Sequence, residues 1–223
     1  MSDIFAGRDP RDLPRYLVAD AARILDLPRA TVHAWVVGRA LPGRADLVPI
    51  IQAAAPRSLS FTNLIEVHVL RAMRKEHKVS MASVRDALAT LQKQFPGPHP
   101  LATRAFLTDG NDLFVEELGR LVKLSSSEQL GLHEQLKLHL KRIECDEQGL
   151  ARRLYPFMGE ARNVIIDPRV SFGRPVLAGT GVPIDNLVER LNAGDTVEDL
   201  ADDYGLTPDV VRDAIRVAVQ DAA

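Results

Sequence analysis

The sequence has little cysteine, few aromatic residues and no long run of apolar residues. Its single thiol, Cys145, cannot form an internal disulfide or a cysteine-rich metal site, which excludes a disulfide scaffold and a metal-sensing thiol cluster. A lone thiol is typical of a protein from a reducing compartment. No segment approaches the roughly 18 apolar residues of a membrane-spanning helix. The N-terminal residues contain no apolar run flanked by positive charge. We therefore expect a cytoplasmic protein without a membrane partner.

Signatures of nucleotide binding and of metal binding are also missing. The glycine-rich stretch Gly173–Gly181 has neither the Lys-Ser/Thr ending of a phosphate-binding loop nor the spacing of a dinucleotide fingerprint. Its glycines instead predict unusual backbone angles in a turn that Pro175 and Pro183 stiffen. His133, His139 and Cys145 have no recognised ligand spacing. The sequence therefore predicts no cofactor and no metal site.

No combination of side chains predicts an active site, so we do not expect an enzyme. One catalytic alternative is an acidic, metal-dependent nuclease centred on four carboxylates, Asp199, Asp202, Asp203 and Asp209. Asp199 and Asp203 would share a helix face, but many solvated acids do the same. Magnesium-dependent cleavage of nucleic acid, abolished by Asp203→Asn, would favour that alternative.

Charge divides the chain into a basic beginning and an acidic end. Residues 1–95 carry 14 basic and nine acidic side chains, a net charge of +5, whereas residues 161–223 carry six basic and 11 acidic ones, a net charge of −5. The segment between them has a net charge of −2. A basic module neutralises phosphates, whereas an acidic module repels them. The two ends of the chain are therefore expected to bind different partners.

Proline and helical periodicity predict the organisation of the chain. The segment Phe95–Pro100, with three prolines, cannot continue a helix, so we predict a first domain at 1–96, a connector at 97–160 and a last domain at 161–223. Apolar residues at three- and four-residue steps predict a helix over Phe61–His77 and a second one from Val84 to Phe95, which Ser80 or Ser83 would cap. Further helices are expected at Ile184–Asn192, Val197–Tyr204 and Pro208–Asp221.

Short strands are expected in the connector and at the start of the last domain. Arg104–Thr108 and Leu113–Glu117 flank a turn-like Asp-Gly-Asn-Asp segment, and Lys141–Cys145 and Leu150–Phe157 flank another turn. Asn163–Ile166 is a further strand candidate. The fold class is thus mainly α with a small β-rich connector.

One helical pattern occurs twice, 179 positions apart. Shifting residues 18–36 onto residues 197–215 superimposes the positions that would pack against one another: Val18 on Val197, Asp20 on Asp199, Ala22 on Ala201, Leu27 on Leu206, Val32 on Val211 and Val36 on Ile215. A helix, a tight turn with an apolar residue and a second helix form a helix-turn-helix unit, in which a small residue such as Ala22 allows close crossing. Trp35 is expected in the core.

The outward positions of the two copies differ. In the first copy Arg29, Thr31 and His33 point outward, with Arg39 and Arg44 just downstream. In the second, residues 185–213 hold nine acids against two arginines. Because a helix in the major groove lies among phosphates, we assign DNA to the first copy and a protein partner to the second.

Residues 16–41, YLVADAARILDLPRATVHAWVVGRAL, resemble the winged helix-turn-helix of the MerR and excisionase type, and Phe61 with the segment KVSMASVRDALATL at 78–91 extends the resemblance. The resemblance implies that Arg29, Thr31 and His33 approach bases. It also implies that Arg39, Arg44 and Arg57 lie in or near the wing and contact phosphate. The cysteine-bearing effector region of the metal-sensing members is absent.

Residues 163–219 resemble the domain of unknown function numbered four hundred and thirty-three, which occurs in VapB-like antitoxins. The resemblance rests on Ile166-Asp167-Pro168, Gly173-Arg174-Pro175-Val176, Gly179-Thr180, Val182-Pro183 and the closing helices. Gly181 stands where the family usually has Arg. Together the two resemblances imply a helix-turn-helix-like last domain and an antitoxin regulator partnered with a PIN-like ribonuclease toxin.

The sequence thus predicts an antitoxin that binds double-stranded operator DNA as a homodimer, represses its own transcription and neutralises the toxin by direct contact. The expected partner-binding residues are Arg174, Asp199, Asp202, Asp203 and Asp209. The alternative is a free-standing MerR-like regulator whose last domain dimerises or senses a small molecule.

Overall fold

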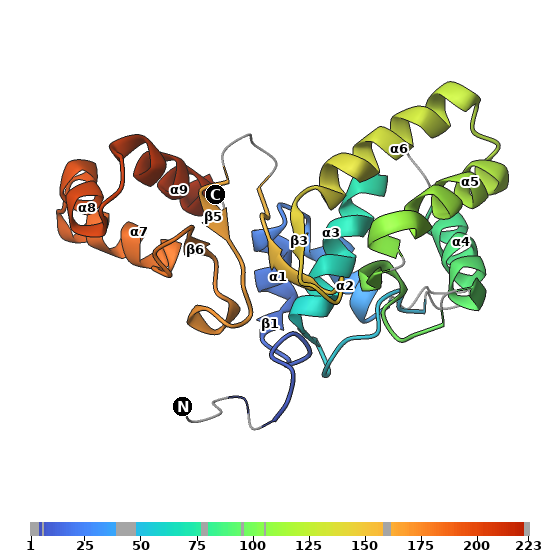
Figure 1. The fold of residues 1–223 in the computed structure, drawn as a ribbon, viewed down its shortest axis with the longest axis horizontal. Helices are drawn as coiled ribbons and strands as arrows, with labels where there is room; N and C mark the ends of the chain where they lie inside the picture. Colours follow the sequence, from blue (N-terminus) through green and yellow to red (C-terminus); the bar gives the residue numbers. More distant parts are fainter. Residues whose placement is uncertain are drawn as a thin grey trace. The chain divides into compact units, whose positions relative to one another are not determined.

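The computed structural model describes residue 5 and residues 7–38, 48–76, 80–94, 96–104, 106–157 and 162–220. Contacts group the chain into two units, residues 1–152 and residues 153–223, and each unit is described by itself. Helices dominate the described residues, and the strands form small two-stranded sheets (Figure 1). The mainly α fold class is confirmed. The division into three domains and the winged character of the first stay predictions.

The first unit opens with a strand that leads directly into a pair of packed helices. β1 (Tyr16–Leu17) is followed without a break by α1 (Val18–Ile24), and α2 (Arg29–Val36) packs across α1. β1 pairs in antiparallel fashion with β2 (Ser58–Leu59). The β1–β2 pair therefore joins the start of α1 to the residues directly before α3, which begins at Phe61.

The centre of the first unit is α3 (Phe61–Glu76), which packs against α6 (Ser126–Leu140). Every side chain from Asn63 to Ala72 is buried, so α3 is covered on all sides. α4 (Met81–Gln94) follows, and the Ser83 amide donates to the Ser80 hydroxyl at 3.1 Å. The prediction of two helices with a serine cap at the second is therefore confirmed.

Buried polar side chains of α3 each have a partner. The Glu66 carboxylate accepts hydrogen bonds from Asn63 and from Nδ1 of His99, the latter at 3.0 Å. Burial raises the pKa of Glu66, and the hydrogen bond to Glu66 raises the pKa of His99. Asn63 in turn donates to the Gln52 carbonyl. These bonds connect α3 to segments on both sides of it in the sequence.

His68 is the second buried polar centre of α3. Its ring is fully buried, and Nε2–H donates to the backbone carbonyl of His139 on α6 at 3.0 Å. The two imidazole rings lie 5.1 Å apart. Burial, with the nearby charges of His139, Arg71 and Arg142, lowers the pKa of His68 to about 3. His68 is therefore a neutral packing residue that joins two helices.

The first predicted hairpin of the connector is wrong. Residues Arg104–Thr108 and Leu113–Glu117 lie instead in and around a π-helical turn, η2 (Phe106–Gly110), and α5 (Asn111–Val122). Within α5, Phe114, Val115 and Leu118 are buried, at the one- and three-residue steps of a helix face. The five residues Leu113–Glu117, taken as a strand, are too few to show this helical period. Asp112 lies in the first turn, where the helix dipole favours an acid. The polar segment therefore begins a helix rather than closing a hairpin.

The second predicted hairpin of the connector is confirmed. β3 (Ile143–Cys145) pairs with β4 (Ala151–Leu154), and the Asp146 amide donates to the Leu150 carbonyl at 2.8 Å to close the turn. The boundary between the two units falls inside β4.

The second unit is a small sheet followed by three helices. β5 (Val164–Ile165) pairs in antiparallel fashion with β6 (Val176–Leu177), and a short 3-10 turn, η3 (Ser171–Gly173), lies between them. The helices are α7 (Ile184–Ala193), α8 (Val197–Tyr204) and α9 (Pro208–Gln220). Their inner faces share one apolar core, with Leu187, Leu200 and Val211 at 0% exposure.

The predictions for the second unit agree with these elements. All three helices form at the predicted positions, and α9 begins at the predicted proline. Gly173, Gly179 and Gly181 have φ angles of 76°, 83° and 72°, so the glycine-rich stretch does supply left-handed turns.

Candidate nucleic-acid and partner interfaces

The two aligned segments share one turn geometry. The first helix of each, α1 or α8, is followed by a left-handed residue: Asp26 has φ 48° and Gly205 has φ 64°. The next amide then donates to the carbonyl five residues earlier. These bonds are Leu27 to Ala22 and Leu206 to Ala201, both 2.9 Å long. The 179-residue offset seen in the apolar positions therefore holds for the backbone.

The equivalence extends to both ends of the turn. The Asp20 carboxylate accepts from the backbone amide of Leu17, and the Asp199 carboxylate accepts from that of Thr196. The second helix starts at equivalent positions, at residue 29 in α2 and residue 208 in α9. Trp35 is 1% exposed, as predicted for a core residue. Packing thus dictates the same scaffold in both copies.

The outward face of α2 brings two of the predicted DNA-binding residues together. Arg29 and His33 line one shallow depression with Ala30, Ala34 and Gly38. Arg29 is exposed and His33 is half-buried. The small side chains leave room for a flat ligand edge to approach the helix. Ala30, Ala34 and Gly38 were not predicted as site residues, because they carry no charge and belong to no motif. Only their position on the helix face opposite Val32 and Val36 could have identified them.

The remaining predicted DNA-binding residues do not join that depression. Thr31 is half-buried and does not line it. Arg57 is exposed in the tight turn between Ala55 and Ser58, with φ 58°, at the start of β2. Arg39 and Arg44 lie outside the described residues.

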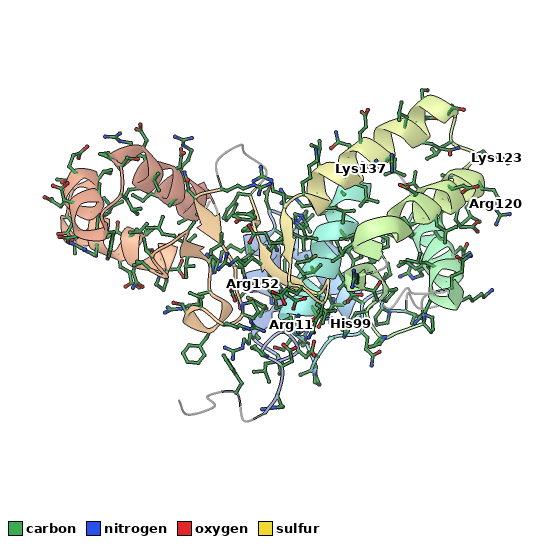
Figure 2. The ribbon with its side chains drawn as sticks, in the orientation of Figure 1. Arg11, His99, Arg120, Lys123, Lys137 and Arg152 are labelled. Atoms are coloured by element: carbon green, nitrogen blue, oxygen red, sulfur yellow. The ribbon has the colours of Figure 1, made fainter. Side chains whose placement is uncertain are left out.

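Three other basic side chains of the first unit lie at the end of α5 and on α6. Figure 2 shows Arg120 and Lys123 at the end of α5 and Lys137 on α6. Arg120 is an ion-pair partner of Glu117 at 2.6 Å. Arg11 and His99 line a small cavity, but Arg11 already contacts the carboxylates of Asp9 and Asp146. The guanidinium of Arg11 is thus committed to internal contacts.

The predicted acidic partner surface is largely engaged in local contacts. Asp199 caps α8 by accepting from the amide and hydroxyl of Thr196, and these bonds lower its pKa. Asp203 pairs with Arg190 at 2.6 Å, and Asp209 pairs with Arg212 at 2.9 Å. Asp202 is exposed. These carboxylates therefore do not converge on a common point as metal-dependent nuclease ligands would.

Arg174 lies on a different part of the second unit from these acids. It is exposed and directly follows η3, two residues before β6 begins. The structure therefore separates the predicted partner-binding residues into a helical acidic set and a loop arginine.

The described residues contain no group of three or more His, Cys, Asp or Glu side chains that could hold a metal ion. His139 packs on His68, His133 contacts Asp112, and Cys145 is exposed on β3. Within the same part of the chain, no helix has the length and apolar character needed to cross a membrane.

One family model matches part of the second unit, and one solved structure matches most of the chain. The family model described as "Protein of unknown function (DUF433)" matches residues 164–218. A crystal structure of Rv2018 from Mycobacterium tuberculosis superimposes with a TM-score of 0.72 at 33% identity, covering 91% of this chain and 98% of that one.

Two proteins of Mycobacterium tuberculosis are similar over most of their length. The uncharacterized protein Rv2308 is 28% identical over 90% of this chain and 88% of its own. A protein named "Putative antitoxin VapB45" is 36% identical over 92% of this chain and 93% of its own. The chain therefore belongs to the family of VapB45-like antitoxins.

Proposed function

We propose that this chain is an antitoxin and a transcriptional autoregulator. Its first unit binds operator DNA as a homodimer, and its second unit captures a PIN-like ribonuclease toxin. The observation that carries the proposal is the repeated scaffold with opposite charge: the outward side of α2 presents Arg29 and His33, whereas α8 and α9 present acids. The antitoxin name of the VapB45 relative supports the same function.

The face of α2 suits a duplex for two reasons. Arg29 can bind a guanine edge or a phosphate, and Ala30 and Ala34 allow the helix to approach closely. The exposed Arg57, on the turn before β2, provides a phosphate contact beside the helix. Arg39 and Arg44 are proposed to extend this contact along the wing.

The test of DNA binding uses the full chain and the DNA upstream of its own gene. The double variant Arg29→Ala with His33→Ala should weaken operator binding by at least tenfold. It should also reduce the slope of log K against log salt by about 0.9 for each lost phosphate contact. Asp202→Asn is the matched control, because it removes an exposed charge from the second unit. Equal operator binding by both variants and the unaltered chain would contradict the assignment.

Toxin capture is tested separately, by co-purification with the protein encoded in the adjacent reading frame. The Arg29→Ala, His33→Ala variant should capture it as well as the unaltered chain does. Operator binding without any capture would instead favour the free-standing regulator.

A further inference from the structure

The outward face of α2 combines one cation with two small side chains. Arg29 is the first residue of α2, Ala30 follows it, and Ala34 lies one helical turn beyond Ala30. All three line the same shallow depression. Arg29 and Ala30 are exposed, and no hydrogen bond or ion pair holds the Arg29 guanidinium in the part of the chain that the structure describes. One available guanidinium and two methyl groups therefore share this face.

Packing does not require small residues at the two alanine positions. In the second copy of the scaffold, Asp209 stands at the position of Ala30. Asp213 stands at the position of Ala34. The side chain of Asp209 is 90% exposed and that of Asp213 is 37% exposed, so these outward positions accommodate a side chain longer than a methyl group. Alanine at both positions of α2 is therefore a property of the outward face and not of the core.

Side chains without hydrogen-bonding groups restrict which base edges can lie against them. In the major groove guanine, adenine and cytosine present polar edges, whereas thymine also presents its C5-methyl group. A polar base edge pressed against a methyl group loses its hydrogen bonds to water without a replacement. A thymine methyl in the same place loses no hydrogen bond and is removed from water. Ala30 and Ala34 therefore favour thymine over the other bases.

Arg29 adds a polar contact beside the apolar ones. The N-terminal residues of a recognition helix are those that reach base edges in the major groove, and Arg29 begins α2. An arginine in this position forms two hydrogen bonds with O6 and N7 of guanine, its commonest specific contact. The rise from Arg29 to Ala34 is about 7.5 Å along the helix axis, roughly two base-pair steps. The three side chains therefore reach neighbouring base pairs.

We infer that α2 reads a guanine close to thymine in each operator half-site. Arg29 binds N7 and O6 of the guanine, and Ala30 and Ala34 contact thymine methyl groups. The inference rests on the proposed function and names the base pairs within its DNA target. Phosphate contacts alone are indifferent to N7 of guanine and to the thymine methyl. Base analogues that change one of these groups therefore test the inference directly.

The first arm of the test changes the DNA and leaves the protein unaltered. The full chain is titrated with synthetic duplexes of its operator in which one thymine at a time is replaced by uracil, which lacks only the C5-methyl group. At one or two thymines of each half-site the affinity should fall about fourfold, the effect of one buried methyl group. Replacing the neighbouring guanine by 7-deazaguanine, which lacks the N7 acceptor, should weaken binding about fivefold or more. Uracil at the other thymines is the control and should change the affinity by less than twofold.

The second arm assigns each contact to α2 with protein variants. In Ala30→Ser with Ala34→Ser the uracil penalty should disappear and the 7-deazaguanine penalty should persist. In Arg29→Ala the reverse should hold. Low salt keeps the binding of each variant measurable, because phosphate contacts are strongest there. The aspartates at the equivalent positions of α9 indicate that the scaffold accepts larger residues, so the serine variant should keep its thermal midpoint.

The outcomes separate this inference from the proposed function. If the unaltered chain binds the operator and tolerates every uracil and 7-deazaguanine within twofold, the base contacts are absent and DNA binding still stands. Penalties that persist unchanged in the α2 variants would place base reading on another element and overturn the inference. Failure of the unaltered chain to bind the unmodified operator would overturn both the inference and the proposed DNA binding.

Discussion

The buried His68 makes the stability of the first unit depend on pH. In the folded protein its pKa is lowered from 6.5 to about 3, so it stays neutral at any pH above that value. In the unfolded chain the imidazole takes up a proton as the pH falls through 6.5. Between these two values the unfolded chain therefore binds one more proton, and the free energy of unfolding falls by about 1.4 kcal/mol per pH unit. Between pH 7 and pH 5 the loss is about 1.9 kcal/mol.

The assay compares the full chain with His68→Gln by urea unfolding at pH 7, 6 and 5. Fluorescence of Trp35, the single tryptophan, reports the first unit because its ring is 1% exposed there. Glutamine keeps an N–H that can donate to the His139 carbonyl but does not titrate. The stability lost between pH 7 and pH 5 should be smaller in His68→Gln by about 1.9 kcal/mol, since other titrating groups contribute equally to both proteins.

A second variant separates titration from the lost hydrogen bond. His68→Leu leaves the His139 carbonyl without its imidazole donor and should be less stable than His68→Gln at pH 7 by about 1 kcal/mol. Its pH dependence should nevertheless match that of His68→Gln. If the unaltered chain and both variants lose equal stability between pH 7 and pH 5, His68 titrates alike in the folded and unfolded states and the reasoning is wrong.

Three further predictions concern local structure. His99→Leu removes the imidazole donor of the buried Glu66 and should cost about 1–3 kcal/mol in urea unfolding. The cost should be larger near pH 6 than at alkaline pH, because stability from the raised His99 pKa is present below 6.5 and lost above the folded value. Gly205→Ala should lower the thermal stability of the second unit by about 1 kcal/mol from φ 64° alone, whereas Gly97→Ala, equally open but not left-handed, should not. Ser125→Ala should cost about 1 kcal/mol by removing the α6 capping box, and Ser126→Ala, one residue inside the helix, should cost much less in the same melt.

Helices with a regular apolar period and the second hairpin of the connector could be predicted from the sequence, whereas the helical first part of the connector could not. The period of α9 and the Thr-Pro-Asp start at residue 207 identify the helix directly. The residues Asp109–Asp112, before and at the start of α5, resemble a turn. The helix is favoured because α5 packs against α4 and α6 and buries Phe114 and Leu118. Tertiary packing therefore decided what local propensity left open.

The candidate interfaces were predictable in charge but not in geometry. Counting acids located the acidic unit, yet it could not show that Asp203 of α8 pairs with Arg190 of α7. The sequence also contains no pattern that predicts left-handed backbone at all three residues Ser171–Gly173. That conformation depends on the Gly181 carbonyl and on Asp167, which lie on the flanking strands and loops.

The two copies of the repeated turn reach the same left-handed geometry by different means. Gly205 adopts it at no steric cost and faces open space. Asp26 pays a conformational cost at the equivalent position, but its carboxylate accepts from Arg71 of α3 at 3.3 Å. The first turn is thereby tied to the central buried helix, which fixes the direction in which α2 projects from the unit. The proposed entry of α2 into a DNA groove in one register requires such a fixed direction.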